Sequence, residues 1–172
     1  MCLKTVQEYI KSTRLKSERD RQSEKKVSGV FTGSYAIHPF TGKKVAIWIA
    51  DYVIVSYGTG AVMAVPCGDQ RDWLFAKHYN IDIINIFKAI DISESSFEGK
   101  DALIKDSKFL NNLNCSDAIN LSIEHIVKKG IGKERIDLIN QGIFPFKTND
   151  AKLADKMNEA VKKGNLQAVS NK

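Results

Sequence analysis

The sequence has no apolar run of about eighteen residues, the length that a helix needs to cross a bilayer. Its first residues are amphipathic and mixed in charge, whereas a signal peptide has a basic segment followed by an apolar one. We therefore expect neither a membrane span nor a signal peptide, and we expect a cytosolic protein. The 43% hydrophobic and 27% charged content of the 172 residues is typical of one globular domain.

Cysteine and histidine are scarce and widely spaced. Cys2, Cys67 and Cys115 lack the paired spacing of a zinc site or a disulfide framework, so we expect reduced thiols. No histidine lies near Cys67 in sequence, which favours a small buried side chain over a catalytic nucleophile. The three histidines are His38, His78 and His125. They are scattered along the chain and lack the spacing of metal ligands. We predict no metal site and no cofactor.

Sequence motifs for phosphate binding are also missing. Gly58 and Gly60 are the first two glycines of a dinucleotide fingerprint, but the third is absent and the segment leads into an apolar run typical of a strand, not a helix. There is no P-loop lysine and no nucleophile elbow. We therefore reject the dinucleotide fingerprint, and neither a P-loop site nor a nucleophile-elbow site is expected.

The net charge of +6 belongs to the two ends of the chain. Residues 1–29 carry eight Lys and Arg against four Asp and Glu, and residues 143–172 carry six against three. The central residues 30–142 sum to −1. The centre therefore lacks the charge excess that usually accompanies tight phosphate binding.

Hydrophobic periodicity predicts both helices and strands along this chain. Three spans have helical spacing, namely 3–23, 69–80 and 116–130, and a capped amphipathic segment covers 150–163. Apolar runs predict strands at 30–40, 45–50, 52–55, 61–65 and 81–87. We expect the second of these strands to be buried on both faces and to follow a glycine-containing hairpin turn at 41–44.

The remaining segments are less regular. Residues 88–100 are polar enough for a surface loop, and residues 102–104 and 109–110 are expected to anchor it to the core. Residues 136–146 are apolar but irregular, and the last residues from Gly164 are expected to be disordered. The organisation we expect is an N-terminal amphipathic helix at 1–28, a core domain at 29–133 and a divergent extension at 134–172.

The chain is organised around residues 57–72, where a glycine turn and an apolar run lead through Pro66 into the start of a helix. Asp69 is a good N-cap, and Asp72 occupies the position of the acid in a capping box. Both carboxylates could serve only to stabilise the helix. Either could instead face a small pocket and hold a charged ligand, and the local pattern leaves both roles open, more so for Asp72.

Four blocks of sequence resemble the editing domain of bacterial leucyl-tRNA synthetase. They are Gly29 to Lys43, Ile47 to Val53, Tyr57 to Pro66 and Asp69 to Asp72. The residues at 109–113 and 129–133 also resemble the family's segment that leads back to its catalytic core. The resemblance runs from about residue 6 to residue 133, and its most specific block is 57–72. It implies an α+β fold, in which helices flank a small, mixed or barrel-like sheet.

The resemblance implies hydrolysis of an ester between a wrong amino acid and the 3′ end of leucine tRNA. A second sieve of this kind is needed because a hydrophobic pocket cannot reject a near-isostere strongly. In the family, the residue matching Asp72 holds the substrate ammonium, and those matching Tyr57, Met63 and Val65 line the pocket. The resemblance gives supporting roles to Asp69, Arg71, Gly58, Thr59 and Gly60, and it implies the rest of a leucyl-tRNA synthetase as a partner.

Three departures from the family pattern stand out. The threonine-rich strand that should precede this segment is absent, Gly68 stands where many relatives carry histidine, and the sequence diverges beyond Arg135. The ATP-binding signatures of the synthetase are also missing, so we do not expect aminoacylation by this chain. The alternatives are an inactive remnant, a module that binds the tRNA end or an aminoacyl-adenosine, and a purely structural domain.

Overall fold

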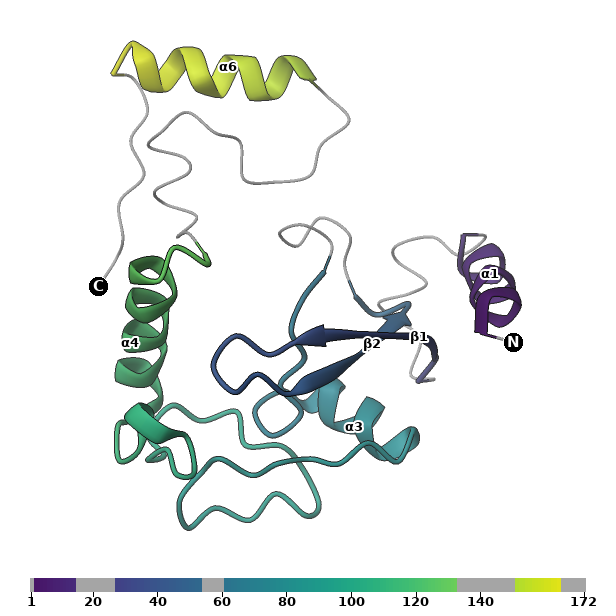
Figure 1. Ribbon diagram of the computed structural model, residues 1–172, viewed down its shortest axis with the longest axis vertical. Helices are drawn as coiled ribbons and strands as arrows, with labels where there is room; N and C mark the ends of the chain where they lie inside the picture. Colours follow the sequence, from purple (N-terminus) through teal and green to yellow (C-terminus); the bar gives the residue numbers. More distant parts are fainter. Residues whose placement is uncertain (1, 15–26, 54–60, 133–150, 165–172) are drawn as a thin grey trace.

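The computed structural model describes residues 2–14, 27–53, 61–132 and 151–164, and these form a mixed α/β fold (Figure 1). A two-stranded sheet lies at the centre of the drawing, with α1 to one side and α4 to the other. The small sheet with flanking helices agrees with the predicted α+β class. Within these ranges no helix is long and apolar enough to cross a membrane.

The strands β1 (Gly29–Ile37) and β2 (Lys44–Ala50) form an antiparallel hairpin, as predicted. Gly29 pairs with Ala50 and Ile37 with Lys44, and the register shifts between Phe31 and Tyr35. The turn is closed by hydrogen bonds from the His38 amide to the Lys43 carbonyl and from the Gly42 amide to the His38 carbonyl. Gly42 has a φ of 70°, a conformation that glycine adopts without steric cost.

The prediction that β2 is buried on both faces is wrong, because its first four residues are exposed. Only its second half is covered. There the Trp48 ring packs against Phe75, with centroids 5.5 Å apart, and against Tyr79 at 4.8 Å. In a sheet of only two strands, helices can cover one face and leave the other exposed. An unbroken apolar run in such a strand therefore need not be buried throughout.

The helix α1 (Cys2–Thr13) packs against β1 and covers the first part of the predicted span of 3–23. Residues 15–23 of that prediction lie outside the described residues. Leu3, an apolar residue near the start of that helix, is 71% exposed. A closed ring of hydrogen bonds anchors the helix instead. Tyr9 donates to the Ser28 hydroxyl at 2.9 Å, Ser28 donates to Asp51 at 2.7 Å, and the Asp51 amide donates to the Tyr9 oxygen at 3.1 Å.

The helix α3 (Gln70–His78) supplies the aromatic layer under the hairpin. Its side chains at Trp73, Phe75 and Ala76 are buried. The helix ends near the predicted residue 80. Tyr79 is its C-cap, Asn80 has a φ of 52°, and the Ile81 amide donates back to the Ala76 carbonyl.

The chain from 81 to 114 is mostly irregular, and the strand predicted at 81–87 is wrong. Only isolated β-bridges form here, one between Phe87 and Ile104 and one between Leu103 and Asn114. The short helix η1 (Lys108–Leu110) lies between Ile104 and Asn114 in the sequence. The loop predicted at 88–100 is present and contributes Ile92 to the core. The anchors predicted at 102–104 are confirmed, since the core cluster comprises Cys67, Phe87, Ile92, Ala102, Ile104 and Ala118.

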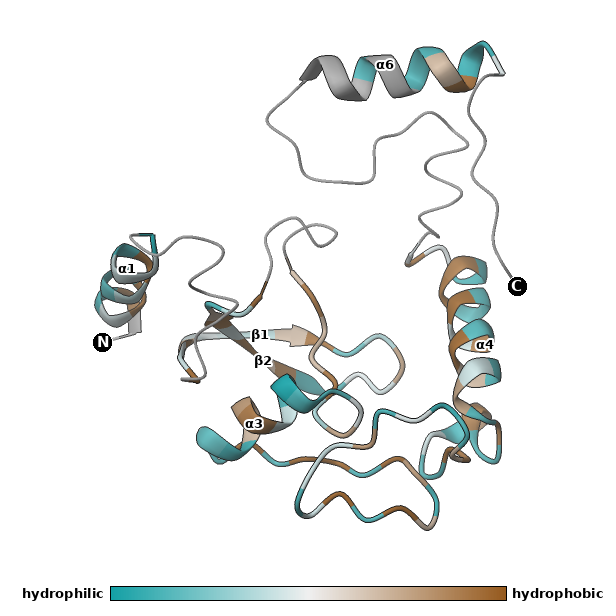
Figure 2. Ribbon diagram, turned by 180° about the vertical axis from the view of Figure 1, so that it is seen from behind, coloured by the Kyte–Doolittle hydropathy of each residue, from teal (hydrophilic) through white to brown (hydrophobic). Residues whose placement is uncertain are grey.

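The helix α4 (Cys115–Lys128) closes this core, and Figure 2 shows its apolar and polar residues on different sides. It begins slightly before the predicted start, because Asn114 is the N-cap and accepts from the Asp117 amide at 2.9 Å. Gly130 follows its C-terminus with a φ of 68°, as the sequence predicts. Ala118 is the residue of α4 that joins the core cluster, whereas Ile119 is 55% exposed.

The helix α6 (Ala151–Lys162) matches the helix predicted at 150–163. Figures 1 and 2 both show it apart from the other described elements. The irregular segment expected at 136–146 and the disordered end expected after Gly164 fall almost wholly outside the described residues.

Candidate functional site

The site is built on the N-terminus of α3. The Asp69 side chain accepts from the amides of Arg71 at 2.9 Å and Asp72 at 3.0 Å, so the predicted N-cap is confirmed. These two bonds satisfy donors that have no partner inside the helix. Asp69 is therefore a structural residue of the site, and the exposed Arg71 follows it on the first turn.

Asp72 does not complete a capping box, and that part of the sequence interpretation is wrong. In such a box its carboxylate would accept from the Asp69 amide, but this amide donates to the Val65 carbonyl at 2.9 Å. Asp72 Oδ2 instead accepts from the Val65 amide at 2.8 Å. The carboxylate thus reaches back past the helix start and holds the preceding segment.

Tyr52 holds the other oxygen of this carboxylate. Its hydroxyl donates to Asp72 Oδ1 at 2.6 Å, a short distance typical of a charge-assisted hydrogen bond. Burial, and then the bond to Asp72, raise the pKa of Tyr52 well above its usual value, so the phenol keeps its proton and remains a donor. Sequence patterns assigned Tyr52 to a strand and missed this role. The only sequence signal for this role was the polar hydroxyl of Tyr52 between two apolar runs.

Residues 61–65 form an irregular segment, so the strand predicted there is wrong. All five residues are exposed, and Val62, Met63 and Val65 expose 47%, 57% and 46% of their surface. The apolar run predicted burial, but the described sheet places no strand beside it. Its apolar side chains therefore stand on the surface next to Asp72. Met63 and Val65, two predicted pocket residues, lie in this segment.

Four other predicted residues, Tyr57, Gly58, Thr59 and Gly60, lie outside the described residues. The structure does bring Asp69, Asp72 and Val65 together at one end of α3. The roles proposed for Tyr57 and the three positions that follow it remain predictions.

A loop at 96–98 braces the same helix end. The Gln70 side-chain oxygen accepts from both the amide and the hydroxyl of Ser96 at 2.9 Å, and the Gln70 amide donates to Glu98 at 3.1 Å. The Phe97 amide donates to the Cys67 carbonyl at 2.9 Å. Residues about 26 positions away in sequence thus fix the first turn of α3, which carries Asp72.

Cys67 is 5% exposed and belongs to the core cluster, which confirms it as a buried filler. Burial raises the pKa of its thiol, so the reactive thiolate is disfavoured. Cys115 is a half-buried free thiol packed against the same cluster. Across the described ranges, no group of three His, Cys, Asp or Glu side chains is placed to hold a metal ion.

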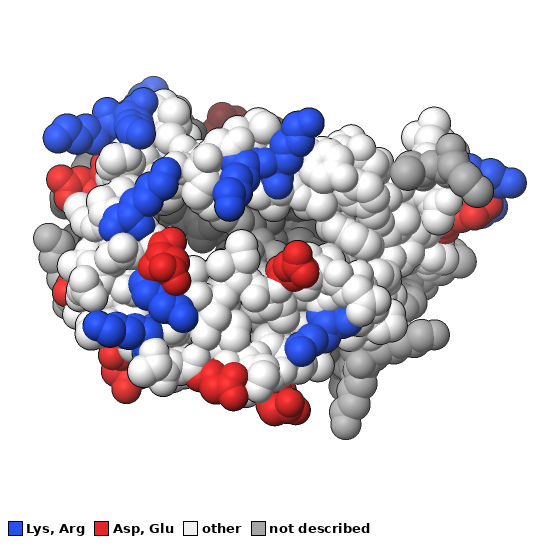
Figure 3. All heavy atoms as spheres, turned by 60° about the horizontal axis from the view of Figure 1, so that its bottom comes forward, with Lys and Arg blue, Asp and Glu red and all other residues white. Residues whose placement is uncertain are grey.

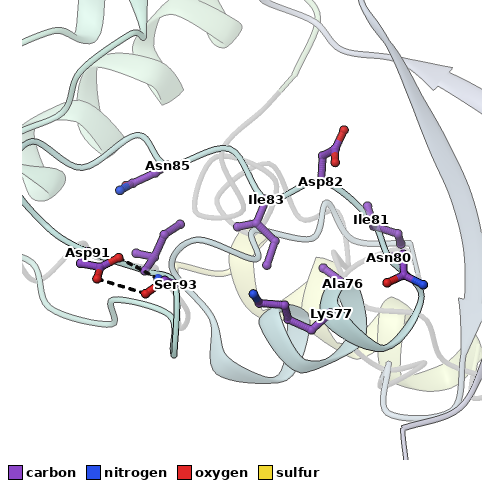
Figure 4. Close-up of a pocket in the computed structure, with 10 residues that line it drawn as sticks. Ala76, Lys77, Asn80, Ile81, Asp82, Ile83, Asn85, Asp91 and Ser93 are labelled. Carbon is purple, nitrogen blue, oxygen red and sulfur yellow. Dashed lines mark hydrogen bonds between the residues drawn. The ribbon is translucent and has the colours of Figure 1, made fainter.

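A hollow of about 530 Å³ lies at the other end of α3 (Figure 4). Lys77 reaches into it, while Asp91 and Ser93 lie together at its far side, joined by hydrogen bonds of 2.9 and 3.0 Å. Lys77 also lies 5.0 Å from the centre of the Trp73 ring. None of the residues predicted for the site lines this hollow, so it is separate from the carboxylate at Asp72.

Comparison of the sequence with known protein families gives a family that is consistent with this fold. Residues 2–128 match the family described as "Leucyl-tRNA synthetase, editing domain". The matched range extends from the start of α1 to the end of α4 and includes every described residue of the site. The class that these features define is an editing domain of an aminoacyl-tRNA synthetase. The chain belongs to the leucyl-tRNA synthetase editing-domain family.

Several leucine–tRNA ligases are similar to this chain. That of Azobacteroides pseudotrichonymphae is 46% identical over 133 residues, which are 77% of this chain and 14% of the relative. That of Christiangramia forsetii is 51% identical over 129 residues, or 74% and 13%. That of Flavobacterium johnsoniae is 49% identical over 135 residues, or 74% and 14%. The chain thus spans about one seventh of the length of these curated relatives.

Proposed function

We propose that this chain supplies the carboxylate side of an editing site that hydrolyses wrongly aminoacylated leucine tRNA. The observation that carries the proposal is the fixed carboxylate of Asp72, held by Tyr52 at 2.6 Å and by the Val65 amide at 2.8 Å. A carboxylate whose orientation is fixed at both oxygens is preorganised to bind a cation. Each oxygen keeps a lone pair for a further donor.

In this proposal Asp72 accepts hydrogen bonds from the ammonium group of the esterified amino acid. Anchoring that group fixes the neighbouring ester carbonyl against the exposed surface of Met63 and Val65. The oxygen of a water molecule then bonds to the carbonyl carbon, and the bond from that carbon to the ribose oxygen breaks. The ribose oxygen takes a proton, and the products are a free amino acid and uncharged tRNA.

The 3′ end of aminoacylated leucine tRNA is the substrate in this proposal, and the rest of a leucyl-tRNA synthetase is the partner. Two features support a partner. The first is a set of exposed apolar side chains beside Asp72, namely Val62, Met63 and Val65. Exposed apolar side chains that lie together are typical of a surface that another protein covers. Family membership supports the same partner. A cytoplasmic location follows from the proposal, because tRNA is charged for translation there.

Complementation tests this function directly. The chain is mixed with a leucyl-tRNA synthetase that lacks the corresponding region, and release of a near-isostere of leucine from mischarged leucine tRNA is followed. We expect deacylation to be restored by the native chain and by Asp82→Ala, an exposed carboxylate that lies beyond the other end of α3. Asp72→Ala should restore none. Association of the pieces without any deacylation would exclude a working editing site.

A second candidate is a module that binds the aminoacylated tRNA end without turnover. The open surface around Met63 favours it, because hydrolysis needs a reacting ester shielded on more than one side. It predicts that an aminoacyl-adenosine analogue binds the isolated chain, that Asp72→Ala abolishes this binding, and that no product forms. Calorimetry with a non-hydrolysable analogue distinguishes it from a structural domain, which would bind nothing.

A further inference from the structure

Residues 81–85 follow α3 and have the exposure pattern of a strand, although no strand pairs with them in the part of the chain that the structure describes. Ile81, Ile83 and Asn85 are half-buried, whereas Asp82 and Ile84 are exposed. An alternation with a period of two residues is typical of an extended chain that has one face on the protein. Ile84 leaves 68% of its surface exposed. We call residues 81–85 the edge segment.

The backbone of the edge segment is open to a partner. Within the described ranges, no hydrogen bond reaches the amides or carbonyls of residues 82–85. The antiparallel bridge that follows ends where the Lys105 amide donates to the Ile86 carbonyl at 2.7 Å, and Asp106 then turns its chain away with a φ of 51°. Alternate residues of a strand share an edge, so Asp82 and Ile84 direct their backbone groups to the same edge as Ile86. The edge segment therefore extends a ladder whose second strand has ended.

Natural proteins usually protect an exposed strand edge with lysine or proline, because unpaired backbone groups are a template for another chain. The edge segment contains neither residue, and Asp82 is its one charged residue. Its sequence therefore leaves the edge able to accept an added strand.

The hollow of about 530 Å³ at the end of α3 lies along the edge segment. Ile81, Ile83 and Asn85 line it, and Lys77 of α3 lines it from the other side. Figure 4 shows Ile83 and Lys77 pointing toward each other, while Asp82 points away from Lys77. Because side chains alternate between the two faces of a strand, a strand laid beside the edge segment would direct every second side chain over the hollow.

Lys77 gives the hollow an available positive charge. Its ammonium has no carboxylate of the described residues within 4.0 Å, and it lies 5.0 Å from the centre of the Trp73 ring. The Trp73 indole donates to the Ile92 carbonyl at 3.0 Å, which fixes that ring. The carboxylate of Asp91, across the hollow, is held at both oxygens by Ser93 instead of by Lys77. An acidic side chain that enters the hollow would therefore meet an unpaired cation.

We propose that the edge segment and the hollow bind an extended, acidic segment of a partner protein by strand addition. In this mode of recognition, main-chain hydrogen bonds supply affinity and pockets for alternate side chains supply specificity. The open backbone of residues 82–85 provides the first, and the hollow with Lys77 provides the second. Figure 3 brings forward the bottom of Figure 1, and both signs of charge occur on that face. A segment with a single acidic side chain suits such a face better than a polyanion does.

This docking site is distinct from the proposed editing site. It lies at the other end of α3 and shares no residue with Asp72, Tyr52 or Val65. The inference does not depend on ester hydrolysis and can fail or succeed without it.

Fluorescence anisotropy with a labelled peptide tests the inference on the full chain. The probe has blocked ends and about six residues, the length of the edge segment, with valine and threonine alternating and one central valine replaced by glutamate. Lys77→Met keeps the aliphatic stem but removes the charge, and we expect about two- to fivefold weaker binding, the effect of one exposed ion pair. Lys100→Met is the matched control, because Lys100 is exposed but does not line the hollow. A probe with lysine in place of glutamate should bind the native chain more weakly, and this difference should disappear in Lys77→Met.

Ile84→Pro tests the backbone pairing. Proline removes the amide that an added strand needs, and we expect about fivefold weaker binding, the effect of one lost hydrogen bond. Ile84→Thr is the matched control, since it keeps the amide and a β-branched side chain, and it should bind like the native chain. Circular dichroism verifies that both variants are folded.

Amide hydrogen exchange locates the bound peptide. Exchange at Asp82 and Ile84 should slow more than exchange at Ile83, because only alternate amides face an added strand. Protection confined to other segments, equal binding by folded Ile84→Pro and Ile84→Thr, or no binding at about 1 mM peptide would overturn the inference.

Free glutamate and a second copy of the chain are the competing occupants. Displacement of the peptide by free glutamate at the same concentration would show that Lys77 recognises a carboxylate alone, and strand addition would be wrong. A dimer of the native chain in sedimentation, dissociated by Ile84→Pro, would assign the edge segment to pairing between two copies and would overturn a separate partner.

Discussion

The Tyr52 hydroxyl and the Asp72 carboxylate lie 2.6 Å apart and connect the end of the hairpin to the first turn of α3. The Tyr52 ring also packs against Phe75, with centroids 5.7 Å apart. One side chain therefore both contributes to the aromatic layer and orients the carboxylate of the proposed site. Loss of its hydroxyl should affect stability and function while the ring packing stays intact.

Tyr52→Phe removes that single oxygen. We expect the free energy of unfolding to fall by about 1–3 kcal/mol, because a hydrogen bond to a charged, half-buried carboxylate is lost. Urea unfolding measures the change. Tyr35→Phe is the control, since Tyr35 is exposed, and it should shift stability by less than about 0.5 kcal/mol. Equal stabilities of the two variants would contradict the role given to Tyr52.

The pH dependence of stability carries a second signature of the same bond. The pKa of Tyr52 is raised in the folded protein, chiefly by burial, so the native state holds this proton more tightly than the unfolded state does. The stabilisation is complete below the usual tyrosine pKa of about 10 and is lost as the pH rises above it. The stability difference between the native chain and Tyr52→Phe should therefore narrow between pH 9 and pH 11, as followed by thermal unfolding at each pH. A constant difference would show that Tyr52 titrates normally.

Asp69 stabilises the helix through two amide hydrogen bonds, and this role can be separated from its charge. Asp69→Ala should cost about 0.5–2 kcal/mol, the usual effect of losing an N-cap. Asp69→Asn keeps an oxygen that accepts both amides and should retain most of the stability. Chemical denaturation compares the two, and a similar loss in both would mean that charge at the helix start matters more than capping.

The Cys67 thiol should be unreactive in the folded protein. It is 5% exposed and its pKa is raised by burial, so both access and thiolate formation are disfavoured. In a Cys2→Ser background, the half-buried Cys115 should react with a disulfide reagent at neutral pH before Cys67 does. Comparing Cys67→Ala with Cys115→Ala assigns the two rates. Faster labelling of Cys67 would show that the core cluster opens readily.

Local signals predicted much of this structure. The N-cap at Asp69, the helical spacing that follows it and the glycine after Lys129 depend on neighbouring residues, so the sequence alone locates α3 and α4. The hairpin was likewise predicted from its turn. The start of α4 differs from the predicted residue 116 by one position, because Asn114 caps the helix.

Contacts between distant residues could not be predicted in the same way. The runs at 61–65 and 81–87 have the composition of strands, but pairing requires a neighbouring strand, and composition does not specify one. The bond from Tyr52 to Asp72 and the brace from Ser96 to Gln70 join side chains that are 20 and 26 positions apart. No periodicity shows such pairs. The resemblance indicated Asp72 but not the groups that hold it.

The bond from the Val65 amide to Asp72 gives the site a form of thermodynamic linkage. One carboxylate holds the backbone of the segment that carries Met63 and is also the proposed ligand for an ammonium group. A bound ammonium changes the equilibrium constant for forming the hydrogen bond from the Val65 amide by some factor. By linkage, forming that hydrogen bond changes the affinity of Asp72 for the ammonium by the same factor. The order of residues 61–65 and the occupancy of Asp72 are therefore reciprocal quantities, and amide exchange at Val65 reports on both.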